Sequence, residues 1–345
     1  MQKKTVTFGE IMLRLKTPEF QRILQAHQFE AIYGGGEANV AASLAIFGLP
    51  VSFVTRLPAN EIGDACLAFL RRYGVDTKSV LRGGDRLGIY YLEAGAAQRA
   101  SKVVYDRAGS SFATLQPGMV DWEEVFTNSG WFHWTGITPA VSESAAKTCG
   151  EALRVAKKMN LTISCDLNYR AKLWNWTNFP GKVMKNLVQY CDIVIGNEED
   201  AAKVFGIHAP GADIGSGKVD AEKYRTVCEA LVKKMPNLKK VAITLRGSLS
   251  ASHNSWSGVL WTEGKFLVVP SYDILPIIDR VGAGDAFAAG LIYGLKAYSG
   301  DEQKALNFAV ASSCLKHSIL GDFNLATVLE VEALMEGEAS GRVKR

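Results

Sequence analysis

Apolar segments of strand length alternate with helical patterns along most of this chain, and this alternation limits the possible folds more than any other feature. The strand candidates are residues 5–8, 51–55, 130–135, 162–167, 193–196 and 241–245. The helical patterns between them include residues 37–47, 65–73, 142–159 and 201–205. Because helical crossovers join parallel strands, this order predicts an α/β fold with a doubly wound, mainly parallel sheet flanked by helices.

Two segments interrupt the alternation, at residues 11–33 and 87–115. Both are poor in helical patterns and rich in strand formers. Within the second segment, residues 88–93 and 102–105 are typical of a hairpin. We expect the two segments to build a small β-sheet that stands off the main domain as a lid. Two surface hairpins without a lid role are the alternative.

The size and charge of the chain suit one large globular domain. Its 345 residues are 48% hydrophobic, and we expect a domain over residues 1–335 and a flexible tail at 336–345. The net charge of +4 is small, so neither nucleic acid nor a membrane surface is an expected partner. No apolar segment suits a signal peptide or a bilayer span, and the six cysteines form no CxxC pair. These features predict a cytoplasmic protein.

The segment around Asp285 carries the strongest chemical signal. Gly282, Ala283 and Gly284 come directly before it, and residues 286–293 behind it are apolar on every face, as in a buried helix. Amides at the start of such a helix lack carbonyl partners, and with the helix dipole they form a site for a phosphoryl group. A carboxylate in the first turn can accept a proton from an attacking hydroxyl. The alternative is a helix-terminal charge that contributes less than about 1 kcal/mol.

Gly34 and Gly35 belong to a second glycine cluster, which opens a helical pattern at residues 40–47. The glycines let backbone approach a ligand, while Glu37 and Asn39 offer polar groups to substrate hydroxyls. The cluster lacks the third glycine of the dinucleotide-binding fingerprint and does not end the first strand. The chain also contains no GxxxxGK[ST] phosphate loop. A tight turn that only starts a helix is the alternative.

Polar residues stand at the ends of three expected strands, where ligands of open α/β sheets bind. Asp166, Asn168 and Arg170 end the first of these strands, and the planar fork of the arginine suits a carboxylate or phosphate. Asn197 begins an acidic run whose oxygens could hold Mg²⁺, although a helix cap with first-turn acids is the alternative. The third strand end carries Thr244, Arg246 and Gly247.

In this order, the segments resemble those of the ribokinase-like (pfkB) family of carbohydrate kinases, over nearly the whole chain. The resemblance rests mainly on the GAGD segment at residues 282–285 and on the glycine cluster at 34–39. It implies that Asp285 is the catalytic base and that the three preceding residues form an anion hole with their amides. It also implies ATP as the phosphoryl donor and Mg²⁺ as a cofactor.

The resemblance extends to the nucleotide and metal sites. It implies nucleotide contacts at Asn197, Thr244, Arg246, Gly247, Gly282, Gly284, Asn307 and Ser313. The segment after Asn197 resembles the magnesium motif of the family, with Asp200 at its fourth position and Glu199 beside it, acting through water. A monovalent cation activates some members of the wider family and is therefore a candidate cofactor here.

Within the family, the closest resemblance is to 2-keto-3-deoxygluconate kinases, through residues 105–110, 136–140, 166–174 and 315–324. It implies substrate contacts at Gly34, Gly35, Glu37, Asn39, Tyr90, Tyr105, Arg107, Ile137, Asp166, Asn168, Arg170 and Asp285. The implied reaction is phosphoryl transfer from ATP to the terminal hydroxyl of this sugar acid, which gives 2-keto-3-deoxy-6-phosphogluconate.

A carboxylate on the substrate gives a physical reason for two arginines. Arg107 and Arg170 would converge on it, whereas a neutral sugar would leave a charge unpaired, at a cost of about 1–3 kcal/mol. Fructokinase or another neutral-sugar kinase of the same family is the main alternative, because only pocket residues separate the two. An NAD-dependent dehydrogenase would need a GxGxxG motif that the chain lacks, and a non-catalytic binding protein would not need Asp285. We also expect a homo-oligomer formed through the lid sheet.

Overall fold

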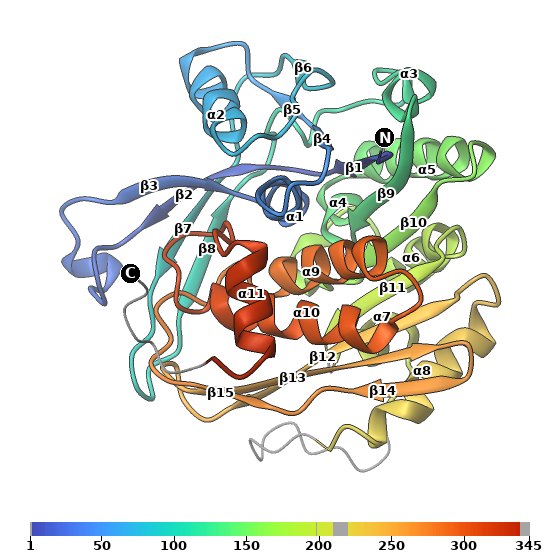
Figure 1. The fold of residues 1–345 in the computed structure, drawn as a ribbon. Helices are drawn as coiled ribbons and strands as arrows, with labels where there is room; N and C mark the ends of the chain where they lie inside the picture. Colours follow the sequence, from blue (N-terminus) through green and yellow to red (C-terminus); the bar gives the residue numbers. More distant parts are fainter. Residues whose placement is uncertain (1, 198, 210–219, 339–345) are drawn as a thin grey trace.

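The computed structural model describes residues 2–197, 199–209 and 220–338, and its centre is a mainly parallel sheet (Figure 1). Six strands run parallel in the order β4-β1-β9-β10-β11-β12. They are β1 (Lys4–Phe8), β4 (Val51–Val54), β9 (Ser129–Thr135), β10 (Thr162–Asp166), β11 (Ile193–Asn197) and β12 (Lys240–Ser248). All six predicted strands are thereby confirmed. Most residues of these strands are buried, polar ones included, because both faces of the sheet are covered.

An antiparallel extension, which was not predicted from the sequence, continues the sheet beyond β12. β13 (Asn254–Thr262) pairs with β12, and both β14 (Lys265–Val268) and β15 (Tyr272–Ile274) pair with β13. Glu263 and Gly264 join β13 to β14, and both have positive φ angles. Such a two-residue turn is a hairpin signal, so this part of the sheet was detectable from the sequence.

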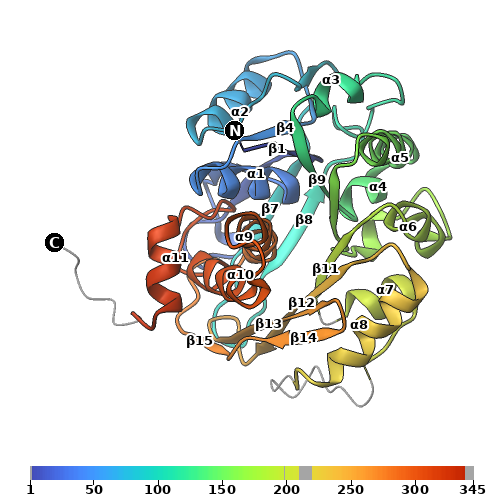
Figure 2. The ribbon, with the colours of Figure 1, turned by 45° about the vertical axis from the view of Figure 1, so that its right-hand side comes forward.

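Helices cover both faces of the sheet, which makes the fold doubly wound (Figure 2). One hydrophobic core lies beneath α1 (Gly36–Ile46), α2 (Glu61–Arg72), α9 (Ala283–Ala297), α10 (Glu302–Lys316) and α11 (Val328–Met335). The other lies beneath α3 (Trp122–Phe126), α4 (Ile137–Val141), α5 (Glu143–Lys158), α6 (Pro180–Val188), α7 (Asp200–Phe205) and α8 (Lys223–Lys234). The four predicted helical patterns correspond to α1, α2, α5 and α7. As predicted, α9 is buried on nearly every side.

A separate four-stranded sheet forms from the two segments that interrupt the alternation. Its order is β3 (Glu30–Gly34), β2 (Met12–Lys16), β7 (Ile89–Glu93) and β8 (Lys102–Asp106). β7 and β8 form the predicted hairpin, and every residue of β8 is exposed. Hereafter this is called the small sheet. Its existence is confirmed, whereas its role as a lid stays a prediction.

The remaining elements are short. They are the pair of strands β5 (Arg56–Leu57) and β6 (Leu81–Arg82) and the 3-10 helices η1 (Ile23–Gln25) and η2 (Ala171–Leu173). Most of the predicted tail, from residue 339 onward, lies outside the described residues.

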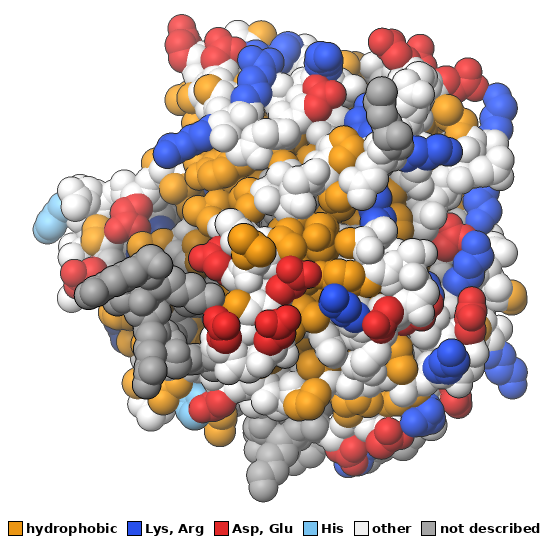
Figure 3. All heavy atoms as spheres, viewed as in Figure 1, with side chains coloured by type: hydrophobic (Ala, Val, Ile, Leu, Met, Phe, Trp, Pro, Cys, Tyr) orange, Lys and Arg blue, Asp and Glu red, His pale blue; other side chains and the backbone are white. Residues whose placement is uncertain are grey.

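On the face seen in Figure 3, basic and acidic side chains are interspersed around apolar ones. No helix within the described residues is long and apolar enough to cross a membrane.

Candidate active site

A cavity of about 500 Å³ lies at the carboxyl ends of the parallel strands, next to the small sheet. Eighteen of the predicted site residues line it: Gly34, Gly35, Asn39, Tyr90, Tyr105, Ile137, Asp166, Asn168, Arg170, Asn197, Glu199, Asp200, Thr244, Arg246, Gly282, Ala283, Gly284 and Asp285. They come from both sheets and from the starts of α1, α4, α7 and α9. The topology therefore gathers residues that lie more than 200 positions apart, such as Asn39 and Asp285, into one wall.

The anion-hole segment adopts the geometry that its glycines require. Gly282 precedes the first residue of α9 with φ 86°, a left-handed conformation that favours glycine. A Cβ on Gly282 would lie 2.0 Å from the carbonyl oxygen of Asp322, so no side chain fits there. The first amides of α9 have no intrahelical carbonyl partner. With the positive end of the helix dipole, they suit an anion in the cavity.

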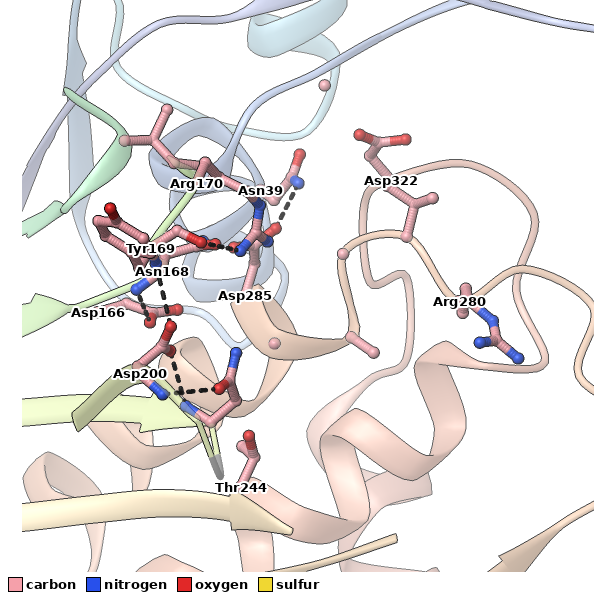
Figure 4. A pocket seen from close by; sticks show the side chains of 18 of the residues that line it. Asn39, Asp166, Asn168, Tyr169, Arg170, Asp200, Thr244, Arg280, Asp285 and Asp322 are labelled. Atoms are coloured by element: carbon pink, nitrogen blue, oxygen red, sulfur yellow. Dashed lines mark hydrogen bonds between the residues drawn. The ribbon is translucent and has the colours of Figure 1, made fainter. Parts of the chain in front are cut away.

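Asp285 occupies the first turn of α9 and is held by a residue from α1. The Nδ2 of Asn39 donates to Oδ2 of Asp285 over 2.7 Å, while Oδ1 of Asn39 accepts from the amide of Gly35 over 3.1 Å. Figure 4 shows Asn39 and Arg170 both pointing toward Asp285. The amide of Gly35, in the second glycine cluster, thus holds the side chain of Asn39, which in turn orients the carboxylate of Asp285.

Burial changes the acidity of this carboxylate. Desolvation raises the pKa of Asp285 to about 6, against the hydrogen bond from Asn39, which lowers it. At neutral pH the group is therefore ionised, yet it is more basic than an exposed aspartate. A pKa near the working pH is what a general base needs.

Asp166, Asn168 and Arg170 lie around the end of β10. The amide of Asn168 donates to Oδ1 of Asp166 over 3.1 Å. Burial raises the pKa of Asp166 well above its usual value, and the charges of Asp200 and Asp285 raise it further. Arg170 is exposed to the cavity and donates to the carbonyl of Tyr169. The charge of Arg170 acts in the opposite direction and lowers the pKa of Asp166.

The acidic run after β11 is arranged mainly as a helix start. Oδ1 of Asn197 accepts from the amides of Glu199 and Asp200. The carboxylate of Asp200 accepts from the amides of Asn197 and Tyr169 over 2.9 and 3.1 Å, which ties the ends of two strands together. Glu199 pairs with Lys203. Glu198 lies outside the described residues.

Five predicted site residues lie outside the cavity wall: Glu37, Arg107, Gly247, Asn307 and Ser313. Glu37, Arg107 and Ser313 are buried and engaged in internal hydrogen bonds. Oε1 of Glu37 accepts from Thr135 and Thr138, and burial raises the pKa of this glutamate to about 7. Ser313 donates to the carbonyl of Ala283 over 2.6 Å and so supports the start of α9 from behind.

Arg107 differs most from expectation. Its Nε donates to Oε2 of Glu10 over 2.9 Å, and Ser110 donates to the other oxygen of the same carboxylate. Glu10 is buried, so it requires a positive partner, and Arg107 supplies it. Of the two arginines, Arg170 lines the cavity and Arg107 does not, and their convergence on a substrate carboxylate stays a prediction.

Gly247 and Asn307 are engaged within secondary structure. Gly247 lies in β12 opposite Ser255, and Asn307 accepts from the side chain of Gln303 within α10.

Several wall residues were not predicted as site residues. They are Met12, Gly36, Val103, Tyr169, Ile195, Gly196, Lys203, Trp256, Arg280, Val281, His317 and Asp322. Asp322 is buried next to Gly282 and forms an ion pair with Arg14 over 2.6 Å. The two charges lie 308 positions apart, so no local pattern could have revealed their pairing.

Comparison with known proteins agrees with this geometry. The crystal structure of the 2-dehydro-3-deoxygluconokinase of Thermotoga maritima has a TM-score of 0.92 and 47% identity, and the match covers 97% of this chain and 100% of that one. The 2-dehydro-3-deoxygalactonokinase of Haloferax volcanii is 29% identical over 341 residues, 99% of each chain. The 2-dehydro-3-deoxygluconokinase of Thermoproteus tenax is 27% identical over 337 residues, which is 96% of this chain and 94% of the relative.

A family model described as pfkB family carbohydrate kinase matches residues 2–322. The matched segment contains the small sheet, α9 and every residue that lines the cavity. The chain therefore belongs to the pfkB family of carbohydrate kinases.

Proposed function

We propose that this chain transfers the γ-phosphoryl group of ATP to the terminal hydroxyl of 2-keto-3-deoxygluconate, which is also called 2-dehydro-3-deoxygluconate. The observation that carries the proposal is the buried Asp285, oriented by Asn39 at the start of α9 and facing a cavity between two sheets. The 47% identical kinase from Thermotoga maritima supports the choice of sugar acid.

In this reaction the sugar acid lies on the side of Tyr90 and Tyr105, and the nucleotide lies over the ends of β11 and β12, near Thr244 and Arg246. The carboxylate of Asp285 accepts the proton of the attacking hydroxyl. The amides at the start of α9 stabilise the charge on the phosphoryl oxygens. Because phosphoryl transfer passes through a loose transition state, positioning of the two substrates supplies most of the rate enhancement.

Mg²⁺ is part of this proposal as a partner of the ATP phosphates, whose charge it neutralises. Among residues 2–197, 199–209 and 220–338, no group of three His, Cys, Asp or Glu side chains could form an all-protein metal site. A site with one carboxylate and several waters fits this donor set, because Mg²⁺ retains waters in proteins. Asp166 fits best, since its pKa is raised by burial and by neighbouring carboxylates that a cation would offset. Glu199 lines the same cavity and could act through water, whereas the carboxylate of Asp200 already accepts two amides.

The substrate carboxylate would pair with Arg170, because Arg107 is already neutralised by Glu10. A neutral ketohexose such as fructose would leave Arg170 without an anionic partner from the substrate, so fructokinase activity stays the weaker alternative. The C4 epimer 2-keto-3-deoxygalactonate is a second candidate substrate, because the Haloferax volcanii relative matches 99% of this chain.

Four further expectations belong to the same proposal: a cytoplasmic location, a small sheet that closes as a lid, a homo-oligomer formed through that sheet, and activation by a monovalent cation. Val104 on the exposed strand β8 is 52% exposed, on the side of the strand opposite to the cavity-lining Val103 and Tyr105, and this suits a subunit contact. Sedimentation of the wild type and of Val104→Lys tests the oligomer. Turnover in potassium against tetramethylammonium salts tests the cation.

The deciding experiment is ADP release with MgATP against 2-keto-3-deoxygluconate, 2-keto-3-deoxygalactonate, fructose, ribose and gluconate. We expect the highest kcat/KM with one or both ketodeoxy sugar acids. Preference for fructose would contradict the pairing of Arg170 with a carboxylate. Absence of ADP release with all five sugars would contradict the substrate class, and Asp285→Asn is the control for contaminating kinases.

A further inference from the structure

Arg14 is a fully buried arginine whose charge is paired with carboxylates of the protein itself. It lies on β2 of the small sheet and is 0% exposed. Its Nη1 donates to Oδ1 of Asp322 over 2.6 Å, and its Nη2 donates to Oδ2 of Asp279 over 2.5 Å. A single guanidinium therefore joins the small sheet to two separate segments of the main domain.

Both acids hold the backbone that forms the anion hole. Oδ1 of Asp279 accepts from the amide of Val281 over 3.1 Å, and Oδ2 accepts from the amide of Gly321 over 3.2 Å. The carbonyl of Asp322 packs so closely on Gly282 that no Cβ fits between them. The position of Gly282 thus depends on both partners of Arg14.

The small sheet contacts the same acid from the substrate side. The hydroxyl of Tyr90, on β7, donates to Oδ2 of Asp322 over 2.5 Å. A Cβ on Gly34 would lie 2.0 Å from that oxygen, so β3 also packs directly against it. Tyr90 and Gly34 both line the cavity. Asp322 therefore lies between the expected sugar-binding surface and the anion hole.

The network is balanced in charge. Lys316 is 0% exposed, and its Nζ donates to the carbonyls of Asp279 and Ile319 over 3.3 and 2.9 Å. Two cations thus face two carboxylates, Asp279 and Asp322, which are 6% and 3% exposed. Loss of Arg14 would leave two buried carboxylates near one ammonium, and their uncompensated charge would disturb the two segments to which they belong.

We propose that Arg14 is a positioning residue that couples the small sheet to the anion hole, so that the sheet which holds the sugar also aligns the phosphoryl site. This role rests on the proposed function of the anion hole, although it does not depend on which sugar binds. Arg14 does not reach the cavity, so it acts through Asp279 and Asp322.

The test compares Arg14→Met, Arg14→Lys and Arg86→Gln. Lysine retains the charge, but all three of its donors lie on one nitrogen, so it cannot reproduce the planar bridge that Arg14 makes with two separate nitrogens to Asp279 and Asp322. Arg86 is the control because it pairs with Asp106 near the surface of the same sheet. For Arg14→Met we expect kcat to fall about 100-fold, as for a misplaced reacting group, with KM for ATP within about threefold of the wild type. Arg14→Lys should lose about tenfold, and Arg86→Gln should retain wild-type kcat.

A second measurement tests anion binding at the start of α9 in the absence of sugar. MgADP with aluminium fluoride mimics the transferring phosphoryl group, so it should raise the Tm of the wild type beyond MgADP alone. In Arg14→Met and Arg14→Lys we expect the MgADP shift to persist and the fluoride increment to disappear. If a folded variant retains the increment and wild-type kcat, the proposal is wrong. If Arg14→Met does not fold, the result for Arg14→Lys alone tests the proposal. If aluminium fluoride does not raise the Tm of the wild type beyond MgADP alone, the anion hole itself is refuted.

Discussion

The substitution Asp285→Asn should lower turnover strongly and at the same time stabilise the fold. The carboxylate is buried, and its pKa is raised from 3.8 to about 6. A raised pKa means that the folded state binds the proton more tightly than the unfolded state. The free energy of unfolding therefore decreases as the pH rises from about 4 to about 6, and above that range it stays at its lower value.

The size of this decrease in stability follows from how far the pKa of Asp285 is raised. About two pKa units, at 1.36 kcal/mol each, correspond to about 3 kcal/mol at pH 8. Asparagine is neutral and of similar shape, and it retains an oxygen that can accept from Asn39. We expect the free energy of unfolding of Asp285→Asn to exceed that of the wild type by up to about 3 kcal/mol at pH 8, and by only about 1 kcal/mol at pH 4.5. For a chain of 345 residues, 3 kcal/mol raises Tm by about 4 °C.

The assay combines urea or thermal unfolding at several pH values with ADP release. Turnover should fall about 10²- to 10⁴-fold, the usual contribution of a general base. Asp64→Asn is the matched control, because Asp64 pairs with Arg82 on the surface and is 67% exposed. Its removal should change stability by less than about 1 kcal/mol. If Asp285→Asn is less stable than the wild type at pH 8, or if its gain in stability does not shrink toward pH 4.5, the buried carboxylate does not cost the stability expected here.

Three further predictions concern the same cavity. kcat/KM of the wild type should fall about tenfold per pH unit below pH 6 as Asp285 is protonated. In Asn39→Ala this acidic fall in kcat/KM should begin at higher pH, because the hydrogen bond from Asn39 lowers the pKa of Asp285. If the fall stays at the same pH, the titrating group is not Asp285. Arg170→Ala should raise KM for a ketodeoxy sugar acid by about 10- to 100-fold, as expected for a lost charged hydrogen bond of 1.5–3 kcal/mol, and should change KM for fructose by much less; equal losses would show that Arg170 does not bind the carboxylate. Gly282→Ala should destabilise the fold by at least about 1–3 kcal/mol, because φ is 86° and a backbone carbonyl lies 2.0 Å from the added Cβ. Gly284→Ala is the control, since its Cβ meets no atom within 4 Å, and it should leave Tm unchanged. Calorimetry measures the Tm of both variants.

Features that depend on neighbouring residues were predicted well. All six parallel strands and the helices α1, α2, α5 and α7 follow from apolar periodicity. The small sheet follows from two segments that are rich in strand formers. The strand pair β13 and β14 was missed, although its turn at Glu263 and Gly264 carries a local signal. Local propensity and hydrophobic pattern therefore contained the alternation of strands and helices, whereas the order of the strands in the two sheets was not predicted.

Partners of buried charges could not be predicted in the same way. Arg107 was expected to reach a substrate carboxylate, but it pairs with Glu10, 97 positions away. Glu37 was expected to meet hydroxyls of a ligand, but its carboxylate fastens α1 to Thr135 and Thr138. A buried charge pairs with whichever opposite charge the packing brings close, and residue type alone does not say which one that is.

Local sequence is enough to specify the α/β alternation, the glycine-rich start of α9 and the placement of Asp285 in its first turn, because each depends on residues within one or two turns of chain. The orientation of Asp285 by Asn39 and the bridge from Arg14 to Asp279 and Asp322 depend instead on how distant segments pack. Their sequence separations are 246, 265 and 308 residues. Contacts over such distances exist only after the sheets have assembled, because chain entropy opposes them until burial of the two cores compensates for it.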